Sequence, residues 1–305
     1  MPELPDIEHM MRGFKGYVLG KEISEVRVLD REYIRVSEEL LRQQVEGHVV
    51  TGVERRGKYV VMPLDSGFSL VFHMGMTGRL ELLPGSEGPS KYDKLILRFA
   101  TGKALHYRCI RKLGAFEVVH DRDFSPLKGL DEMGIEPLSP AFTEDAIKRL
   151  ASRHRRRMAK SFLMDQRIIA GIGNVYSDEI LFQAGIHPEA RMGQLSERKL
   201  AELYREIKRI LHWAVDDYAG FRADDSPLHN HRRVGEPCPR CGTGVERIRV
   251  IGRSAYFCPN CQSLNADSRL QIADSRLQIA DSRLQSRICN PQSRICNLQS
   301  EGAAS

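Results

Sequence analysis

The chain has 305 residues, enough for about two domains and for a core that needs no disulfide support. Hydrophobic residues make up 41% and charged residues 28%, which is typical of a soluble globular protein. No run of about 18 apolar residues occurs, so we expect no membrane span. The first ten residues lack the basic and then apolar pattern of a secretory signal, which favours a cytoplasmic protein. A net charge of +6 permits a polyanionic partner without establishing one.

Residues 1–130 have the pattern of a β-sandwich or barrel that begins with a helix. Ile7, Met10, Met11 and Phe14 recur at helical spacing near the start. Short β-rich runs separated by turn signals follow, which is typical of sandwiches and barrels. The runs are Tyr59–Leu64, Phe68–Phe72, Leu80–Leu83, Leu95–Phe99, Ala104–Tyr107 and Ala115–Val119.

A linker is predicted over residues 131–142, where prolines and glycines cluster. After it the apolar period changes from two to about 3.6, which predicts a helical domain over residues 143–234. Its four apolar stripes are Ala146–Ala151, Phe162–Ile169, Ile180–Ala184 and Leu200–Leu211. Asn174 begins the third helix, and Ser196 is placed to cap the fourth.

Two cysteine pairs predict a zinc ribbon over residues 235–262. Cys238 and Cys241 form one C-x-x-C knuckle, and Cys258 and Cys261 form the other, sixteen residues further on. This spacing is typical of a tetrahedral four-thiolate zinc site that is structural, because protein fills every position. Disulfides or free thiols are the alternative, although seven cysteines in a chain without a signal argue against a disulfide framework. Two predicted strands within the ribbon present Arg253 at their turn.

Residues 263–305 are repetitive, with the unit ADSRLQI twice, ADSRLQ once and then SRICNPQ and SRICNLQ, at a period of seven residues. Heptads can indicate a coiled coil, but three short copies with one Leu and one Ile each make a poor seam. We therefore predict a disordered tail. A scaffold protein that assembles through this tail is an alternative function.

Four separated motifs carry a resemblance to a known family. They are Pro2-Glu3-Leu4-Pro5, Arg55-Arg56-Gly57-Lys58-Tyr59, Gly171-Ile172-Gly173-Asn174-Val175-Tyr176 with Glu179, and the four-cysteine ribbon with Gly252-Arg253-Ser254. Together they resemble the formamidopyrimidine-DNA glycosylases over residues 2–262. The resemblance implies an α+β multidomain fold: an N-terminal β-sandwich, a helix-two-turn-helix domain and a C-terminal zinc ribbon.

The resemblance also implies an activity. The expected enzyme is a bifunctional DNA glycosylase and abasic-site lyase that excises 8-oxoguanine and formamidopyrimidines from damaged double-stranded DNA. It would hold one structural Zn²⁺ and act as a monomer, without an obligate protein partner, in the bacterial cytosol or nucleoid.

Four catalytic residues follow from the resemblance: Pro2, Glu3, Lys58 and Arg253. Removal of Met1 would leave Pro2 with a secondary amine, whose ordinary pKa is about 8, that can attack the sugar C1′ and form an iminium. Glu3 would be the general acid and base, Lys58 would assist β-elimination, and Arg253 would contact phosphate and assist δ-elimination. Taken singly, Pro2 could be an ordinary turn residue, Glu3 a surface carboxylate and Lys58 part of a basic strand edge.

Further positions match DNA contacts of the family. Lys160 and Asn174 match residues that hold the phosphates beside the lesion, and Asn174 opens a helix whose N-terminus favours an anion. Met76, Arg111 and Leu113 match side chains that fill the gap left by an extruded base.

Three more positions complete the predicted site: Tyr92, Arg156 and Glu179. Arg156 lies in a basic cluster that would add affinity without sequence preference. Arg156 could instead belong to a solvated charged face, Glu179 could be an acid on a helix surface, and Met76 could be a core methionine.

The chain departs from the family pattern in ways that concern the lesion. Asp6 stands where Glu is common, Tyr92 where His is common, and Leu113 where Phe is common. The segment over residues 217–234 is also shorter than the usual glycine-rich loop. Oxidised pyrimidines are therefore the alternative substrate class, and a non-catalytic zinc-ribbon protein that binds DNA is the alternative outside enzymes.

Overall fold

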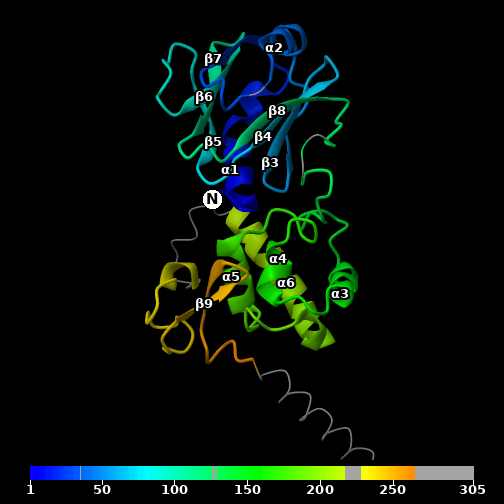
Figure 1. Ribbon diagram of the computed structural model, residues 1–305, viewed down its shortest axis with the longest axis vertical. Helices are drawn as coiled ribbons and strands as arrows, with labels where there is room; N and C mark the ends of the chain where they lie inside the picture. Colours follow the sequence, from blue (N-terminus) through cyan, green and yellow to red (C-terminus); the bar gives the residue numbers. More distant parts are fainter. Residues whose placement is uncertain (35, 126, 128, 217–227, 265–305) are drawn as a thin grey trace, which may run out of the picture. The chain divides into compact units, whose positions relative to one another are not determined.

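The protein is described by a computed structural model, which places residues 1–34, 36–125, 127, 129–216 and 228–264. The interpretations of the heptad repeat and of most of the segment over residues 217–234 concern residues outside these ranges. Residues 1–263 form one unit. In Figure 1 the N-terminus lies between the strands of the first domain and the helices of the second.

The N-terminal domain is a β-sandwich, as predicted. One sheet has the strand order β1 (Ile23–Val28), β6 (Asp93–Phe99), β7 (Lys103–Cys109) and β5 (Gly78–Pro84). The other has the order β2 (Glu54–Arg56), β3 (Tyr59–Pro63), β4 (Phe68–His73) and β8 (Ala115–His120). Every pairing is antiparallel.

The two sheets and the first helix share a hydrophobic core. The helix α1 (Leu4–Val18) contributes Ile7, Met11 and Phe14 to it, at the spacing of one helix face. Phe72 of β4 lies 4.9 Å from the ring of Phe116 on β8 in the same core. The strands β1 and β2 and the short helix α2 (Glu38–Gln44) were not predicted, because they contain few consecutive apolar residues.

The helical domain packs four helices around a second core. They are α3 (Glu144–Arg153), α4 (Ala159–Met164), α5 (Asn174–Gln183) and α6 (Glu197–Asp216). Ser196 caps α6 as predicted, because its hydroxyl accepts a hydrogen bond from the Lys199 amide at 3.3 Å. The second predicted helix was too long: α4 ends at Met164, and the Asp165 side chain accepts from the Arg167 amide in a turn.

The ribbon consists of the antiparallel strands β9 (Glu246–Val250) and β10 (Arg253–Phe257) beside the cysteine knuckles. It is fastened to α5 and the loop after it. The side-chain amide of Gln262 donates to the Ile186 carbonyl at 2.9 Å, and the Arg240 guanidinium lies 4.5 Å from the Phe182 ring centroid. In the described ranges no helix is long and apolar enough to cross a membrane.

Candidate active site

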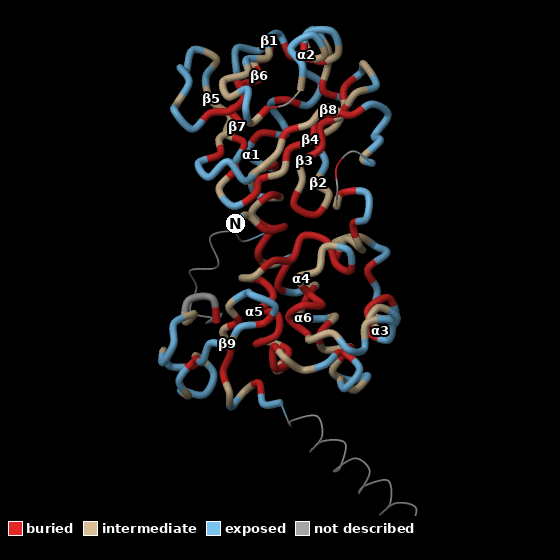
Figure 2. The backbone as a smooth tube through the Cα atoms, viewed as in Figure 1, coloured by how far each residue is buried: buried red, intermediate tan, exposed pale blue. Residues whose placement is uncertain are grey.

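The first residues of the chain are held against the loop that precedes α5. The Leu4 amide donates to the Gly171 carbonyl at 3.0 Å, and the Leu4 side chain is fully buried in the core of the helical domain. Figure 2 shows the buried backbone, in red, where the chain start meets this domain. Gly171 has a φ of 85°, and a Cβ there would lie 2.7 Å from the Leu4 Cβ. Pro2 is thereby fixed near this loop.

Glu3 lies in this contact as a buried acid, 2% exposed. Its carboxyl oxygens accept hydrogen bonds from the amides of Gly173 (2.7 Å), Val175 (2.9 Å) and Tyr176 (3.3 Å) at the start of α5. Burial raises the pKa of the Glu3 carboxyl, while the charge of Lys58 and the three backbone donors oppose that rise. The acid is therefore fixed in position and more easily protonated than a surface glutamate.

Lys58 is the second predicted catalytic residue with a buried side chain, and it is 8% exposed. Burial lowers its pKa, the charges of Glu3 and Asp6 oppose that change, and the charge of Arg253 adds to it. A lysine with a lowered pKa gives up its proton more readily than a surface lysine does. The interactions place Lys58 in the electrostatic field of both predicted catalytic partners.

The predicted linker supports the turn that carries Lys58. The Glu136 carboxylate accepts from the Gly57 amide at 2.5 Å and from the Arg55 guanidinium at 2.7 Å. Gly57 has a φ of 55°, and a Cβ there would lie 2.4 Å from the Met133 sulfur. The turn between β2 and β3 is thus fixed by contacts with residues far along the chain.

His73 is a site residue that the sequence analysis did not single out. It pairs with Tyr59 across β3 and β4, and the two rings are 4.6 Å apart. Burial and the charge of Lys58 lower the pKa of His73 to about 4, so the ring is neutral at pH 7. Its place at the end of a buried strand, opposite the residue after Lys58, was the available signal.

Arg253 is exposed at the first position of β10. The preceding turn has left-handed backbone at Ile251 (φ 46°) and Gly252 (φ 72°). As the ribbon prediction expected, this turn presents the arginine beside the hairpin end.

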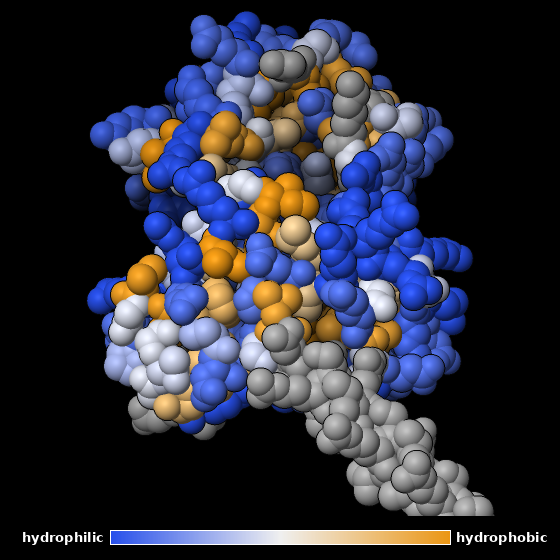
Figure 3. All heavy atoms as spheres, turned by 60° about the horizontal axis from the view of Figure 1, so that its bottom comes forward, coloured by the Kyte–Doolittle hydropathy of each residue, from blue (hydrophilic) through white to orange (hydrophobic). Residues whose placement is uncertain are grey.

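The structure brings the predicted wedge residues together on two adjoining loops. The Arg111 amide donates to the Thr77 hydroxyl at 2.9 Å, and its guanidinium reaches the Met76 sulfur at 3.8 Å. Met76 is 38% exposed and Leu113 is 55% exposed. The surface in Figure 3 is largely hydrophilic with apolar patches among the charged side chains. Exposed apolar side chains on a fixed loop are suited to contact bases.

The remaining predicted DNA contacts differ in accessibility. Tyr92 is 39% exposed, and Arg156 is exposed. Asn174 is half-buried at the first position of α5, and among the described residues its Oδ1 has no hydrogen-bond partner. Glu179 is 2% exposed, and its carboxylate accepts a hydrogen bond from the Gln183 side chain at 2.8 Å.

Lys160 requires a correction. Its side chain is fully buried, and its ammonium donates to the Asp178 carboxylate, to the Ser177 hydroxyl at 3.0 Å and to the Asn174 carbonyl at 3.2 Å. The other Asp178 oxygen accepts from Arg232 at 2.9 Å and from the Tyr256 amide at 3.2 Å. Lys160 therefore joins α4, α5 and the ribbon through Asp178, and in this arrangement it cannot touch a phosphate.

The four ribbon cysteines fit a zinc ion. Their sulfurs lie within 4.8 Å of one another, with Cys241 3.5 Å from both Cys258 and Cys261, and Cys238 4.0 Å from Cys261. Zinc–sulfur bonds of about 2.3 Å in a tetrahedron place sulfurs about 3.8 Å apart. The four thiolates would fill every position of such an ion, which is the arrangement of a structural zinc site.

Comparison with known proteins agrees with this architecture in all three parts. The family model for the formamidopyrimidine-DNA glycosylase N-terminal domain matches residues 1–116, the H2TH domain model of the same family matches residues 133–224, and a zinc finger found in FPG and IleRS matches residues 235–264. A formamidopyrimidine-DNA glycosylase from Pelotomaculum thermopropionicum is 35% identical, over 87% of this chain and all of that protein.

Solved structures agree as well. The wild-type Lactococcus lactis enzyme in complex with DNA containing an N7-benzyl-Fapy-dG has a TM-score of 0.75 and 30% identity, covering 86% of this chain and all of that one. The same enzyme has been solved with DNA containing an oxidised pyrimidine, at the same TM-score, identity and coverage.

The matches and the site together define the class of this protein: a DNA glycosylase that is also an abasic-site lyase. The chain belongs to the formamidopyrimidine-DNA glycosylase family.

Proposed function

We propose that this protein excises oxidised purines from duplex DNA and cleaves the resulting abasic site through an iminium on Pro2. The observation that carries the proposal is the buried carboxyl of Glu3, the residue after Pro2. It accepts hydrogen bonds from three backbone amides at the start of α5, and the charge of Lys58 acts on it. This chemistry requires an amine nucleophile, an acid whose pKa is raised and a lysine whose pKa is lowered.

The reaction begins when the Pro2 nitrogen attacks C1′ and the damaged base leaves. Met1 is 48% exposed and accessible for removal, which the reaction requires because the Pro2 nitrogen is otherwise a tertiary amide. Glu3 donates a proton as the sugar ring opens. Lys58 then moves a proton during β-elimination, and Arg253 binds the phosphate that leaves in δ-elimination.

We assign DNA binding to two groups of residues. Met76, Arg111 and Leu113 fill the gap left by the extruded base, since their loops adjoin and their side chains are exposed. Tyr92 and Arg156 contact the phosphate backbone, and Asn174 does so at the N-terminus of α5. Lys160 and Glu179 act within the fold.

Oxidised pyrimidines are the second candidate substrate class. The Lactococcus lactis relative has been solved with such a DNA. The protein is further proposed to act as a monomer in the bacterial cytosol, with domain limits at residues 1–130, 131–142, 143–234, 235–262 and 263–305.

Borohydride trapping tests the mechanism. The purified protein, with Met1 removal checked by intact mass, is mixed with duplexes carrying 8-oxoguanine, a ring-opened purine, an oxidised pyrimidine or an abasic site, and then reduced. We expect a covalent adduct that maps to Pro2, in greatest yield with the purine lesions and the abasic site. A matched chain with two extra residues before Pro2 should bind the duplex without forming an adduct. Absence of an adduct with every duplex would refute the proposal.

A further inference from the structure

The loop between β7 and β8 contains a backbone conformation that its sequence does not favour. Lys112 has a φ of 51°, in the left-handed region that residues with a Cβ avoid. Its neighbours Arg111 and Leu113 are the exposed side chains proposed to enter the duplex. A strained residue between two functional ones persists only where surrounding contacts hold it.

An ion pair supplies such a contact. The Lys112 ammonium lies 2.9 Å from Oδ2 of Asp30, in the segment after β1. The same oxygen bonds the Lys94 ammonium at 2.9 Å, and Oδ1 accepts from the Tyr33 amide at 3.2 Å. Hydrogen bonds from Lys94 and Lys112 lower the pKa of Asp30 to about 2, so it is charged throughout the working pH range.

The end of the loop is fixed separately. A Cβ on Gly114 would lie 2.2 Å from the Tyr107 hydroxyl and 2.4 Å from the Tyr33 hydroxyl, and these two hydroxyls are 2.9 Å apart. On the other side, Gly75 packs so closely that an added Cβ would lie 2.2 Å from the Leu113 carbonyl oxygen. These contacts fix the backbone after Lys112 and leave its own side chain to Asp30.

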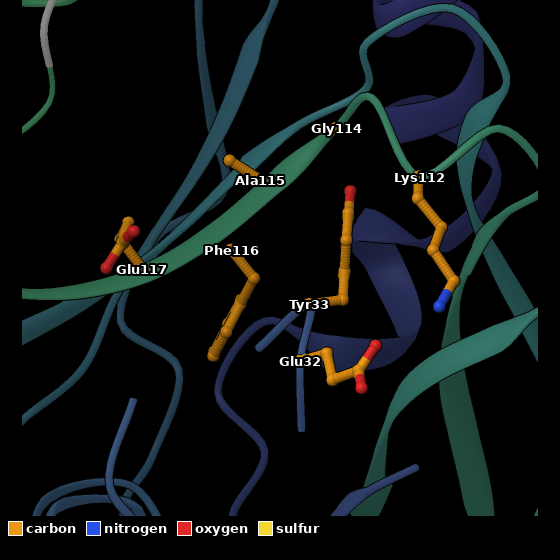
Figure 4. Close-up of a pocket in the computed structure, with 7 residues that line it drawn as sticks. All are labelled: Glu32, Tyr33, Lys112, Gly114, Ala115, Phe116 and Glu117. Atoms are coloured by element: carbon orange, nitrogen blue, oxygen red, sulfur yellow. The ribbon is translucent and has the colours of Figure 1, made fainter. Parts of the chain in front are cut away.

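A pocket lies beside Lys112. Lys112, Tyr33 and Gly114 line a pocket of about 460 Å³ together with Glu32 and the start of β8. In Figure 4 the Lys112 side chain runs from the loop beside Tyr33, whose hydroxyl points toward Gly114. The open space lies beside Lys112, so packing does not hold the Lys112 side chain in place.

We infer that Asp30 and Lys112 form a clasp that holds the left-handed turn and thereby sets the directions of Arg111 and Leu113. Asp30 is then a positioning residue for filling the gap opposite the extruded base. This inference rests on the proposed function of the two wedge residues. It assigns to Lys112 a contact within the protein and not with DNA.

Two substitutions at one position separate the clasp from a DNA contact. Lys112→Ala removes the ion pair and leaves a residue that avoids the left-handed region, whereas Lys112→Gly removes the ion pair but adopts that region readily. Excision from a lesion duplex should fall about tenfold in Lys112→Ala, equivalent to about 1.4 kcal/mol. Lys112→Gly should recover most of that loss. Lys103→Ala is the control. It replaces an exposed lysine at the other end of β7 and should not change the excision rate.

A second readout reports the gap itself. The fluorescence of 2-aminopurine placed opposite the lesion, and the ratio of excision rates opposite dC and dA, should both change in Lys112→Ala. Asp30→Asn should reproduce that change, and the double variant should lose no more than either single one. Melting temperatures check the fold, because Asp30 also holds Lys94. Equal losses in the alanine and glycine variants, or losses that add in the double variant, would overturn the clasp and assign Lys112 to DNA.

Borohydride trapping on single-stranded abasic DNA, which needs no gap filling, separates this inference from the proposed function. We expect all variants to trap as the unaltered protein does. Failure of the unaltered protein to trap would instead refute the Pro2 mechanism.

Discussion

Replacing Gly173 with alanine tests whether the position of Glu3 controls the chemistry. The backbone at Gly173 is extended (φ −127°), so alanine meets no conformational penalty there. Its Cβ would lie 2.3 Å from the Glu3 Cδ. The carboxyl must move by at least about 1.1 Å to regain an ordinary contact of 3.4 Å. A misplacement of about 1 Å can cost roughly 100-fold in rate, so we expect excision to slow by about that factor.

The assay is single-turnover excision with the enzyme in excess, beside a binding isotherm on the same duplex. Duplex affinity should fall by much less than the excision rate, because Glu3 is 2% exposed and is not one of the proposed DNA contacts. Gly13→Ala in α1 is the matched control: nothing lies within 4 Å of its Cβ, and the helix should gain about 0.5 to 1 kcal/mol. Full activity in a folded Gly173→Ala protein would refute the reasoning.

Three further predictions concern pH, zinc and the wedge. The pKa of His73 is lowered from 6.5 to about 4 in the folded protein, so the unfolded chain binds more protons between these pH values. The free energy of unfolding should therefore decrease by up to about 3 kcal/mol as the pH falls from 6.5 to 4. Urea unfolding of His73→Gln should show a smaller loss between pH 7 and 4.5; an equal loss would contradict this assignment. Cys258→Ser should lose zinc and duplex affinity together, measured by metal analysis and anisotropy, and an unchanged metal content would exclude the four-thiolate site. Leu113→Phe should tighten binding to an abasic duplex several-fold through base stacking, and an unchanged Kd would exclude stacking at this position.

The sequence predicted elements and motifs well where a short segment contains the whole signal. The cysteine knuckles and the Ser196 cap are local patterns, and the structure has both. The strand β2 consists of Glu54–Arg56, three charged residues without an apolar pattern, so the spacing of apolar residues could not predict it. It exists because it pairs with β3, which is a tertiary contact.

Lys160 shows why accessibility cannot be read from a charge pattern. It follows a run of arginines, which suggests a solvated basic face. The partner that permits its burial is Asp178, which lies on another helix and also binds the ribbon. Removing one member of such a pair would leave an uncompensated buried charge, which is costly. The basic run and the buried lysine therefore serve different purposes although they adjoin in sequence.

The helix α1 has contacts that would fix the position of the nucleophile proposed at its N-terminal end. Its Leu4 lies in the core of the helical domain, whereas Ile7 and Phe14 lie in the core of the sandwich. Arg12 adds a hydrogen bond from α1 to the Val215 carbonyl of α6 at 2.8 Å. Terminal residues of most proteins are poorly ordered unless they are held in this way. Because Pro2 precedes Leu4 by two residues, we expect the proposed Pro2 nucleophile to take its position only when Leu4 is packed in the core of the helical domain, so its site would depend on the contact between the two domains.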